Sequence, residues 1–473
     1  MSGRKAFATL KFLGAARSVT GSCYLLEVSD RRIMVDCGYY QERDFKHRNW
    51  DPLPESPASI DAVLLTHAHL DHCGLLPKLV RDGFKGHIYC TGPSADIAKV
   101  IMRDSAKIQE EDAKYKARRH AKEGRKSPYP PVPVYKMEDA EAVEPLLRTI
   151  DFGQTVDLGN GVEAEFHIAG HILGSAMITV STEVKGERRS VLFSGDVGRF
   201  GSPLVKDPTL GLEADYVICE STYGNREHED AESIPGKLEK IINETVASGG
   251  NIIIPSFAVE RTQEVLYRLS LLLREGRIPQ LPTYVDSPMA IKVTEIFQKH
   301  TELFDADAAE LLREGKHPCD FPGLQMSRTA QESKAINNLR DSAIIIAGSG
   351  MCTGGRIKHH LVRDISDPEH TVLFVGYQAV ATLGRQILEG ADEVRILGMP
   401  RPVAARIEKI NGFSGHGDRN ELLKWLKSLK REPKHVFLTH GEPRASEPFS
   451  ELIGESLGWD RSIPDYLDEV ELE

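Results

Sequence analysis

The chain has 473 residues, more than one hydrophobic core normally organises, which predicts two or three domains. Its 40% hydrophobic and 27% charged residues exclude a disordered or fibrous chain. The formal net charge of -11 excludes a protein that holds nucleic acid by a diffuse basic surface, so any nucleic-acid contact must be local.

The cysteines and the apolar runs indicate the compartment. The seven cysteines include no C-x-x-C pair, which is typical of reduced thiols in a cytosolic protein. Lys11 and Arg17 interrupt the N-terminal stretch that could mimic a secretory signal. No run approaches the roughly 18 apolar residues of a membrane span. We therefore expect a cytoplasmic protein without a membrane partner.

The first two hundred residues alternate short β-rich runs with turns, which predicts a sheet-rich domain. These runs lie at 9–13, 24–28, 32–35, 62–66, 87–90, 163–168, 176–181, 189–194 and 216–219. Between about Ser94 and Ala121 the pattern is helical, and charges such as Lys107, Glu110 and Lys114 indicate a solvated helix surface. Four prolines within residues 127–134 favour an extended surface connector.

From about residue 226 to 406, apolar strands alternate with segments that can form helices. This alternation predicts a parallel α/β sheet in a second domain. The expected strands lie at 251–254, 283–285, 342–347 and 371–375. The last part of the chain returns to a helix at about 420–430 and a strand at 436–439.

The segment 63–72 carries the strongest chemical signal. Its apolar strand runs into a loop that holds His67, His69, Asp71 and His72. His67 and His69 can face one ion while Asp71 and His72 face a second, and imidazole with carboxylate suits zinc, with manganese or iron as alternatives. The ordinary alternative is a polar surface turn, but clustered unpaired ligand groups would gain nothing for their desolvation. The cluster predicts a two-metal hydrolase.

The H-x-H-x-D-H pattern resembles the signature of the metallo-β-lactamase superfamily. The family's remaining positions are matched in order by Asp36, His171, Asp196 and His440. The resemblance implies a four-layer αββα fold and two zinc ions. It implies that one metal is bound by His67, His69 and His171 and the other by Asp71, His72 and His440. It further implies that Asp196 bridges the two metals and that Asp36 orients the ligand loop.

The order of the segments resembles the β-CASP subfamily of nucleic-acid processing nucleases over nearly the whole chain. Glu220, His416 and His440 match its motifs A, B and C. This resemblance implies that residues 1–225 and 407–473 form the metallo-β-lactamase domain and that 226–406 form an inserted parallel α/β β-CASP domain.

The subfamily implies a phosphodiester-cleaving mechanism. The resemblance implies that Glu220 keeps His416 protonated as the general acid and that Asp71 has a catalytic role beside its metal role. RNA-directed members have His at motif C, where Artemis-like DNA nucleases have Val, so His440 favours RNA. The chain resembles bacterial and archaeal relatives of the pre-mRNA cleavage and polyadenylation endonuclease, and more loosely ribonuclease J.

Several further residues are candidates for substrate contact. The glycine-rich stretch around Gly350 and Arg356 could cradle a phosphate before a helix. Ser256, Arg385 and Ser414 match stretches typical of the subfamily, although a structural role is as good an explanation for any one of them. Three other histidines are not expected to bind metal: His167 is expected to be structural, and His359 and His360 to contact substrate or to be exposed.

Two alternatives stay open. One is a small-ester or thioester hydrolase of the same metal fold, which would have no use for Glu220 and His416. The other is a non-catalytic RNA-processing subunit, which is disfavoured because every metal position is filled. Endonucleolytic cleavage, with 5′ exonucleolytic trimming as a further mode, and a homodimer are left open. No KH-like module is expected before the first strand.

Overall fold

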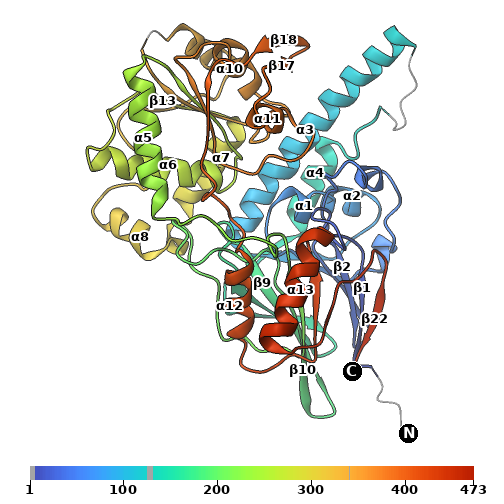
Figure 1. The fold of residues 1–473 in the computed structure, drawn as a ribbon. Coiled ribbons are helices and arrows are strands. Elements are labelled where there is room, and N and C mark those ends of the chain that lie inside the picture. Colours follow the sequence, from blue (N-terminus) through green and yellow to red (C-terminus); the bar gives the residue numbers. More distant parts are fainter. Residues whose placement is uncertain (1–5, 125–130, 340) are drawn as a thin grey trace. The chain divides into compact units, whose positions relative to one another are not determined.

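The structure is a computed structural model that describes residues 6–124, 131–339 and 341–473 (Figure 1). The chain forms two compact units. Unit 1 comprises Met1–Gly201, Asp207–Glu227 and His416–Glu473, and unit 2 comprises Ser202–Lys206 and His228–Gly415. Residues 127–130 of the expected proline-rich connector lie outside the described residues.

Among the described residues, unit 1 forms two seven-stranded sheets. The first has the order β22-β1-β2-β3-β4-β5-β6 and the second β21-β20-β11-β10-β9-β8-β7. The strands of the first sheet are β1 Ala8–Phe12, β2 Tyr24–Val28, β3 Arg31–Val35, β4 Ala62–Leu64, β5 His87–Cys90, β6 Leu147–Thr149 and β22 Glu469–Leu472. Those of the second are β7 Thr155–Gly159, β8 Val162–Ile168, β9 Ala176–Val184, β10 Glu187–Phe193, β11 Tyr216–Glu220, β20 His435–Thr439 and β21 Arg461–Ser462.

The main core of unit 1 lies between these sheets. Side chains alternate along β8, so that Ala164 and Phe166 are buried in the core while their neighbours face outward. Phe12 and Phe437, one from each sheet, pack with their ring centroids 5.3 Å apart. Burying a side chain of this size stabilises the fold by about 1.5–3 kcal/mol.

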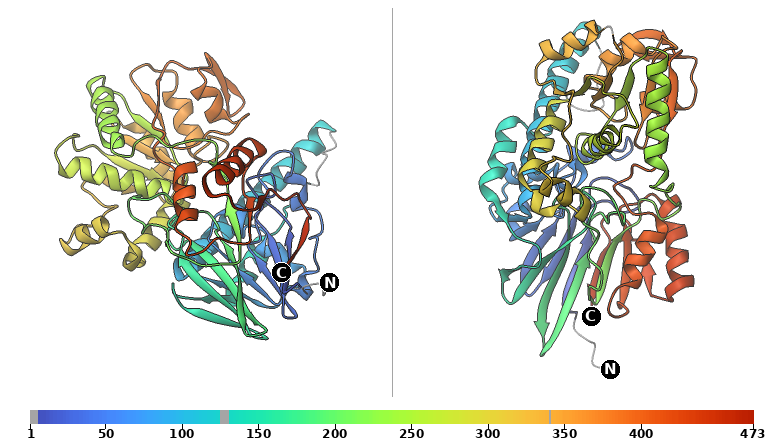
Figure 2. Two further views of the ribbon diagram at one scale, coloured as in Figure 1. Left: turned by 60° about the horizontal axis from the view of Figure 1, so that its bottom comes forward. Right: turned by 90° about the vertical axis from the view of Figure 1, so that its left-hand side faces the viewer.

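Helices cover the outer faces of the two sheets. In α12, Leu422, Trp425 and Leu426 recur at helical spacing and pack on the outer face of the second sheet, and Asp418 caps the helix start. In the right-hand view of Figure 2, the cyan helices lie on one side of the sheets and the red helices on the other. The α-helices of unit 1 are α1 Leu70–Cys73, α2 Leu76–Arg81, α3 Gly92–Glu123, α4 Met137–Val143, α12 Arg419–Lys427 and α13 Pro443–Leu457. Its 3-10 helices are η1 Lys46–Asn49, η2 Pro57–Ser59 and η3 Glu144–Leu146. These layers confirm the predicted αββα fold.

Unit 2 contains a six-stranded parallel sheet, β14-β13-β15-β12-β16-β19, and a separate β17-β18 hairpin. β12 and β15 are isoleucine-rich and fully buried, as expected for strands covered on both faces. The strands are β12 Ile252–Pro255, β13 Thr283–Asp286, β14 Leu324–Met326, β15 Ile344–Ala347, β16 Thr371–Phe374, β17 Glu393–Ile396, β18 Met399–Pro402 and β19 Arg406–Lys409. The helices are α5 Ser233–Ala247, α6 Arg261–Arg274, α7 Pro288–Lys299, η4 Thr301–Leu303, α8 Ala306–Arg313, α9 Ala330–Ala335, η5 Ile336–Asn338, α10 Ile357–Asp364 and α11 Leu383–Leu388. The predicted parallel α/β sheet is confirmed.

Two further observations concern the cysteines and the helices. All seven cysteines are buried free thiols. No described helix combines the length and the apolar character that spanning a bilayer requires.

Candidate metal centre

The candidate ligands lie where strands of unit 1 end. β10, β11 and β20 are parallel neighbours, so the residues after their carboxyl ends meet at one edge of the second sheet. This register brings together Asp196, Glu220 and His440. β3 and β4 are also parallel and carry Asp36 and the His67 loop at their carboxyl ends.

Four side chains, here called the His67 cluster, converge on one point: His67, His69, His171 and Asp196. His69 Nδ1 lies 3.1 Å from both His67 Nε2 and His171 Nε2. Asp196 Oδ2 lies 3.4 Å from the same two Nε2 atoms. One ring nitrogen cannot share a proton with two imidazoles at once, whereas ligands bound tetrahedrally to zinc lie about 3.3 Å apart. The spacing therefore fits a cation held in common.

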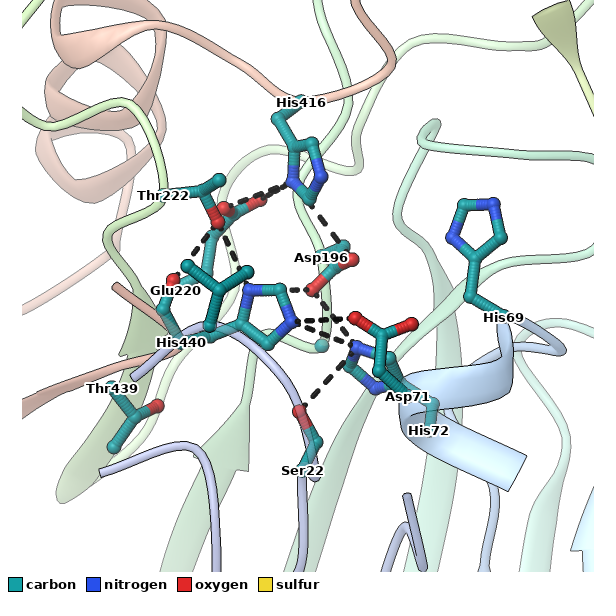
Figure 3. Close-up of polar contacts among 12 residues, drawn as sticks. Ser22, His69, Asp71, His72, Asp196, Glu220, Thr222, His416, Thr439 and His440 are labelled. Carbon is teal, nitrogen blue, oxygen red and sulfur yellow. Dashed lines mark hydrogen bonds and ion pairs between the residues drawn. The ribbon is translucent and has the colours of Figure 1, made fainter. Parts of the chain in front are cut away.

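A second set, the His440 cluster, comprises Asp71, His72, His440 and the other oxygen of Asp196 (Figure 3). His72 Nε2 lies 3.2 Å from His440 Nε2, which lies 3.6 Å from Asp71 Oδ2. Asp196 Oδ1 is buried, lies 3.3 Å from His72 Nε2 and accepts no hydrogen bond from the described residues. Since its two oxygens face different clusters, Asp196 is placed to bridge two ions.

Asp36 and Thr66 fix the tautomers of two histidines. The Asp36 carboxylate accepts hydrogen bonds from the Thr66 hydroxyl at 2.8 Å and from His72 Nδ1 at 2.7 Å. The single hydroxyl proton of Thr66 is thereby used, so at 3.1 Å His67 Nδ1 must be the donor to its oxygen. Each ring then directs its Nε2 at a cluster, and this is the nitrogen that would bind metal once it carries no proton.

Thr222 does the same for His440. Its hydroxyl donates to the backbone carbonyl of His440 at 2.9 Å, so His440 Nδ1, also at 2.9 Å, donates to the hydroxyl oxygen (Figure 3). Neither Thr66 nor Thr222 is among the site residues predicted from the sequence. The available signal was a hydroxyl residue directly before the first ligand and two residues after Glu220.

Burial and charge set the protonation states. Burial lowers the pKa of His67 well below its ordinary value and that of His69 to about 4, so both rings are neutral at pH 7. Burial opposes protonation of His440 and His72, but the Asp196 carboxylate beside them raises the pKa of both rings, that of His72 well above its ordinary value. Burial also opposes ionisation of Asp196, but the charges of these two rings outweigh it and hold the pKa of Asp196 well below the usual range. The neutral imidazoles of His67 and His69 with the ionised Asp196 form a donor set that suits zinc.

His416 lies beside the His67 cluster, paired with Glu220. Its Nδ1 is 3.1 and 3.2 Å from the two carboxylate oxygens of Glu220 and 3.8 Å from Asp196 Oδ2 (Figure 3). Burial disfavours the charged ring, but the charges of Glu220 and Asp196 raise the pKa of His416 to about 9. About 19% of its side chain stays exposed, so a protonated imidazole can meet a substrate.

The other predicted residues lie elsewhere. His167 donates to or accepts from Thr179 at 3.0 Å on the outer face of β8 and belongs to neither cluster. The expectation for His360 was wrong: it is buried, and its Nε2 lies 2.7 Å from Asp286 Oδ2. The helical spacing of Ile357, His360 and Leu361 places them on one buried face of α10, a signal that was present in the sequence. His359 is exposed.

The predicted substrate residues lie in unit 2. Ser256 is buried and accepts from the Thr262 hydroxyl at 3.1 Å, and a side chain at Gly350 would collide with the Phe257 ring. Arg356 donates to Asp286 at 2.7 Å, and Arg385 pairs with Glu389 one turn on. Ser414 lies between β19 and α12. Their contact with a substrate stays a prediction.

Family models match most of the chain. The metallo-beta-lactamase superfamily model matches residues 17–225, and a Beta-Casp domain model matches residues 262–387. A model described as a Zn-dependent metallo-hydrolase RNA specificity domain matches residues 400–464.

Named relatives cover the same span. Ribonuclease TTHA0252 of Thermus thermophilus is 38% identical over 430 residues, 91% of this chain and 92% of that protein. Transcription termination factor FttA is 32% identical in Methanosarcina mazei, over 94% of this chain and 68% of the relative. In Methanocaldococcus jannaschii it is 31% identical, over 98% and 71%. A crystal structure of an Enterococcus faecalis protein of unknown function shares the fold, with a TM-score of 0.57, 12% identity and coverage of 98% of this chain and 100% of that one.

Proposed function

The chain belongs to the metallo-β-lactamase superfamily and carries its β-CASP domain, and from this premise we propose that it is a ribonuclease that uses two zinc ions. The observation that carries the proposal is the pair of ligand clusters bridged by Asp196 and lying beside the His416–Glu220 pair. The match to an RNA specificity domain and the name of the Thermus relative support RNA as the substrate.

The chain's own groups divide the work of hydrolysis. When bound, two zinc ions would activate a water for attack on phosphorus and offset the negative charge that develops there. The His67 and His440 clusters would hold these ions, with Asp36 and Thr222 fixing the imidazoles. Asp71 keeps about 18% of its side chain exposed, so it is suited to accept a hydrogen bond from the attacking water.

His416 is assigned the general-acid role. Because Glu220 holds its Nδ1 proton, Nε2 is the nitrogen that can give a proton to the leaving oxygen. Glu220 also accepts from the Val197 backbone N–H at 2.7 Å, which fixes the carboxylate. A small-ester hydrolase would need no such pair, so the pair favours a poorer leaving group such as the ribose oxygen of RNA.

The test is cleavage of end-labelled RNA by His416→Ala. We expect kcat to fall by about 10³-fold, within the range for loss of a general acid, while elemental analysis still finds the wild-type metal content. His167→Ala is the matched control and should cleave normally. Unchanged RNA cleavage in His416→Ala would sink the assignment and favour the small-ester hydrolase.

Glu220→Gln adds a pH readout. The Glu220 charge raises the pKa of His416, and the imidazole must be protonated to donate. Removing that charge lowers this pKa, so the alkaline limb of the pH–rate profile should move to lower pH. An unmoved limb would show that His416 is not the acid.

The remaining expectations accompany this proposal. Endonucleolytic cleavage is proposed as the main mode. Comparing cleavage of 5′-monophosphate and 5′-triphosphate RNA distinguishes it from trimming at the 5′ end. A cytoplasmic location is proposed because the cysteines are free thiols. The homodimer stays a prediction that light scattering can check.

A further inference from the structure

The second half of α3 contrasts with the rest of this acidic chain. Ala113 is the last buried residue of the helix, which continues to Glu123 and ends on the left-handed Gly124. Residues 114–123, here called the α3 arm, contain five Lys and Arg and one Glu, which gives a net charge of +4 within a chain of net charge -11. In Figure 1 the arm extends away from the sheets of unit 1.

The arm's cations gather on one side of the helix. Lys114, Arg118 and Lys122 follow each other at intervals of four residues and so share a face. Lys114 lies 3.8 Å from Glu110 and is 69% exposed. Arg118 and Lys122 have no ion-pair partner among the residues that the structure describes. Tyr115, beside this face, is 66% exposed, and Ile108, two turns before it, is 52% exposed.

Helix stability does not account for this composition. Cations favour a helix C-terminus through the macrodipole, but that effect falls off within the last turn, where only His120 and Lys122 lie. Lys114 and Arg118 precede that turn. Tyr115 also gains nothing from burial, because it packs in no described core cluster. The arm therefore carries charge and an aromatic ring that its own fold does not require.

We propose that the α3 arm binds single-stranded RNA away from the cleaved bond, with Lys114, Arg118 and Lys122 on successive phosphates and Tyr115 stacked on a base. This inference rests on the proposed ribonuclease function. Cations beside an exposed aromatic ring are the features that hold single strands without reading their sequence. An acidic protein surface would match the charge but has no particular use for the ring.

The position of α3 relative to the metal centre sets the length of RNA required. Thr91 and Ser94, at the helix start, donate to the Gly174 carbonyl at 2.6 and 2.9 Å, and Gly174 follows His171 by three residues. At 1.5 Å per residue the arm begins about 33 Å from that start. A stacked strand rising about 3.4 Å per nucleotide needs roughly ten nucleotides to cover this distance. A 5-mer should miss the arm and a 30-mer should reach it.

The test compares two triple variants with equal loss of charge. Lys114→Gln, Arg118→Gln and Lys122→Gln remove the arm's face, and Lys85→Gln, Lys427→Gln and Lys430→Gln remove three exposed lysines elsewhere on unit 1. Binding is measured by fluorescence anisotropy in a His416→Ala background, so that the RNA stays intact. For the 30-mer, the arm variant should bind at least tenfold more weakly. Its slope of log Kd against log salt should fall by about 2, since each phosphate contact on a single strand contributes about 0.7.

Further variants and substrates distinguish RNA binding by the α3 arm from binding of an acidic protein. Tyr115→Ala should weaken 30-mer binding at least about fivefold, the lower end for base stacking. When His416 is retained, so that the chain can cleave RNA, the triple substitution in the α3 arm should raise KM for the 30-mer and leave cleavage of the 5-mer unchanged. Wild-type 30-mer affinity and salt slope in the arm variant would overturn the inference and make an acidic protein the ligand to test. Absence of any RNA cleavage by the wild-type chain would instead refute the ribonuclease proposal, while the binding comparison still decides the role of the arm.

Discussion

Both units collect polar side chains at the carboxyl ends of parallel strands, but the two collections differ in how they are satisfied. In unit 2, Asp286 ends β13 and is fully buried. It accepts hydrogen bonds from Ser333 at 2.6 Å and from Arg356 and His360 at 2.7 Å each. The Asp286 carboxylate is therefore satisfied by donors of the protein itself, whereas His360 Nδ1 is buried without a hydrogen-bond partner among the described residues.

In unit 1 the strand-end groups do not complete one another. His69 Nδ1 is shared between two imidazoles, and Asp196 brings negative charge to rings whose other nitrogens already donate to hydroxyls or carboxylates. Buried acceptors that face each other at about 3 Å are costly unless a cation lies among them. Clustering of polar side chains alone therefore does not indicate a metal site, whereas a surplus of lone pairs among them does.

The largest expected effect comes from Asp196→Ala, which removes the carboxylate shared by both clusters. We expect metal content to fall from about two ions to one or fewer. RNA cleavage should fall by at least about 10⁴-fold, because the chain would no longer hold both of the ions that activate the water and offset the developing charge. Each tenfold loss corresponds to about 1.36 kcal/mol of transition-state stabilisation. Elemental analysis and kcat on labelled RNA measure this. Full metal content in the variant would contradict the bridging role.

Breaking the Asp286 cluster of unit 2 should act on stability instead. Asp286→Ala leaves the buried His360 and the half-buried Arg356 without their anion, which should cost about 3–5 kcal/mol of unfolding free energy and leave metal content unchanged. Glu295→Ala, which breaks the exposed pair with Arg328, is the control and should cost less than about 1 kcal/mol. Denaturant unfolding followed by far-UV circular dichroism distinguishes them.

The same cluster predicts a pH dependence. Burial opposes ionisation of Asp286, but hydrogen bonds from His360, Ser333 and Arg356 hold its pKa below the ordinary value. A carboxyl with a lowered pKa stabilises the fold above its unfolded pKa, near 4, and loses that contribution as the pH falls further. The difference in stability between wild type and Asp286→Ala should therefore shrink on acidification below about pH 4. A constant difference would mean that the charge of Asp286 contributes nothing.

The smallest expected effect is that of Thr222→Val, which removes only the acceptor of the His440 Nδ1 proton. Loss of such an orienting partner typically weakens metal affinity about 10- to 100-fold. Zinc competition with a chelator should show one of the two ions weakened, and Thr222→Ser should restore it. Equal affinity in Thr222→Val would mean that the backbone alone orients His440.

The local pattern predicted most of the strands that carry the site, because an apolar run ending in a polar residue can be recognised without knowing which strands pair with it. β2 and β5 match the predicted ranges, and the helix expected at about 94–121 is α3. The missed strand β22 pairs with β1, with Ala8 opposite Leu472. Its acidic residues lie at a sheet edge, where charge is tolerated, and its partner is more than 450 residues away, so no local pattern marks it.

The sequence by itself determined the residue types of the metal centre, because H-x-H-x-D-H places four ligand side chains within six residues and requires only a preceding strand to position them. It also determined the charge of the α3 arm. Only the tertiary structure decided which nitrogen of each histidine is available, since Asp36, Thr66 and Thr222 reach the rings through strand pairing. Only the structure separated His360, closed in by Asp286, from the histidines around Asp196. The physical reason is that protonation and ligation depend on the second partner of each ring, and that partner is brought by the fold.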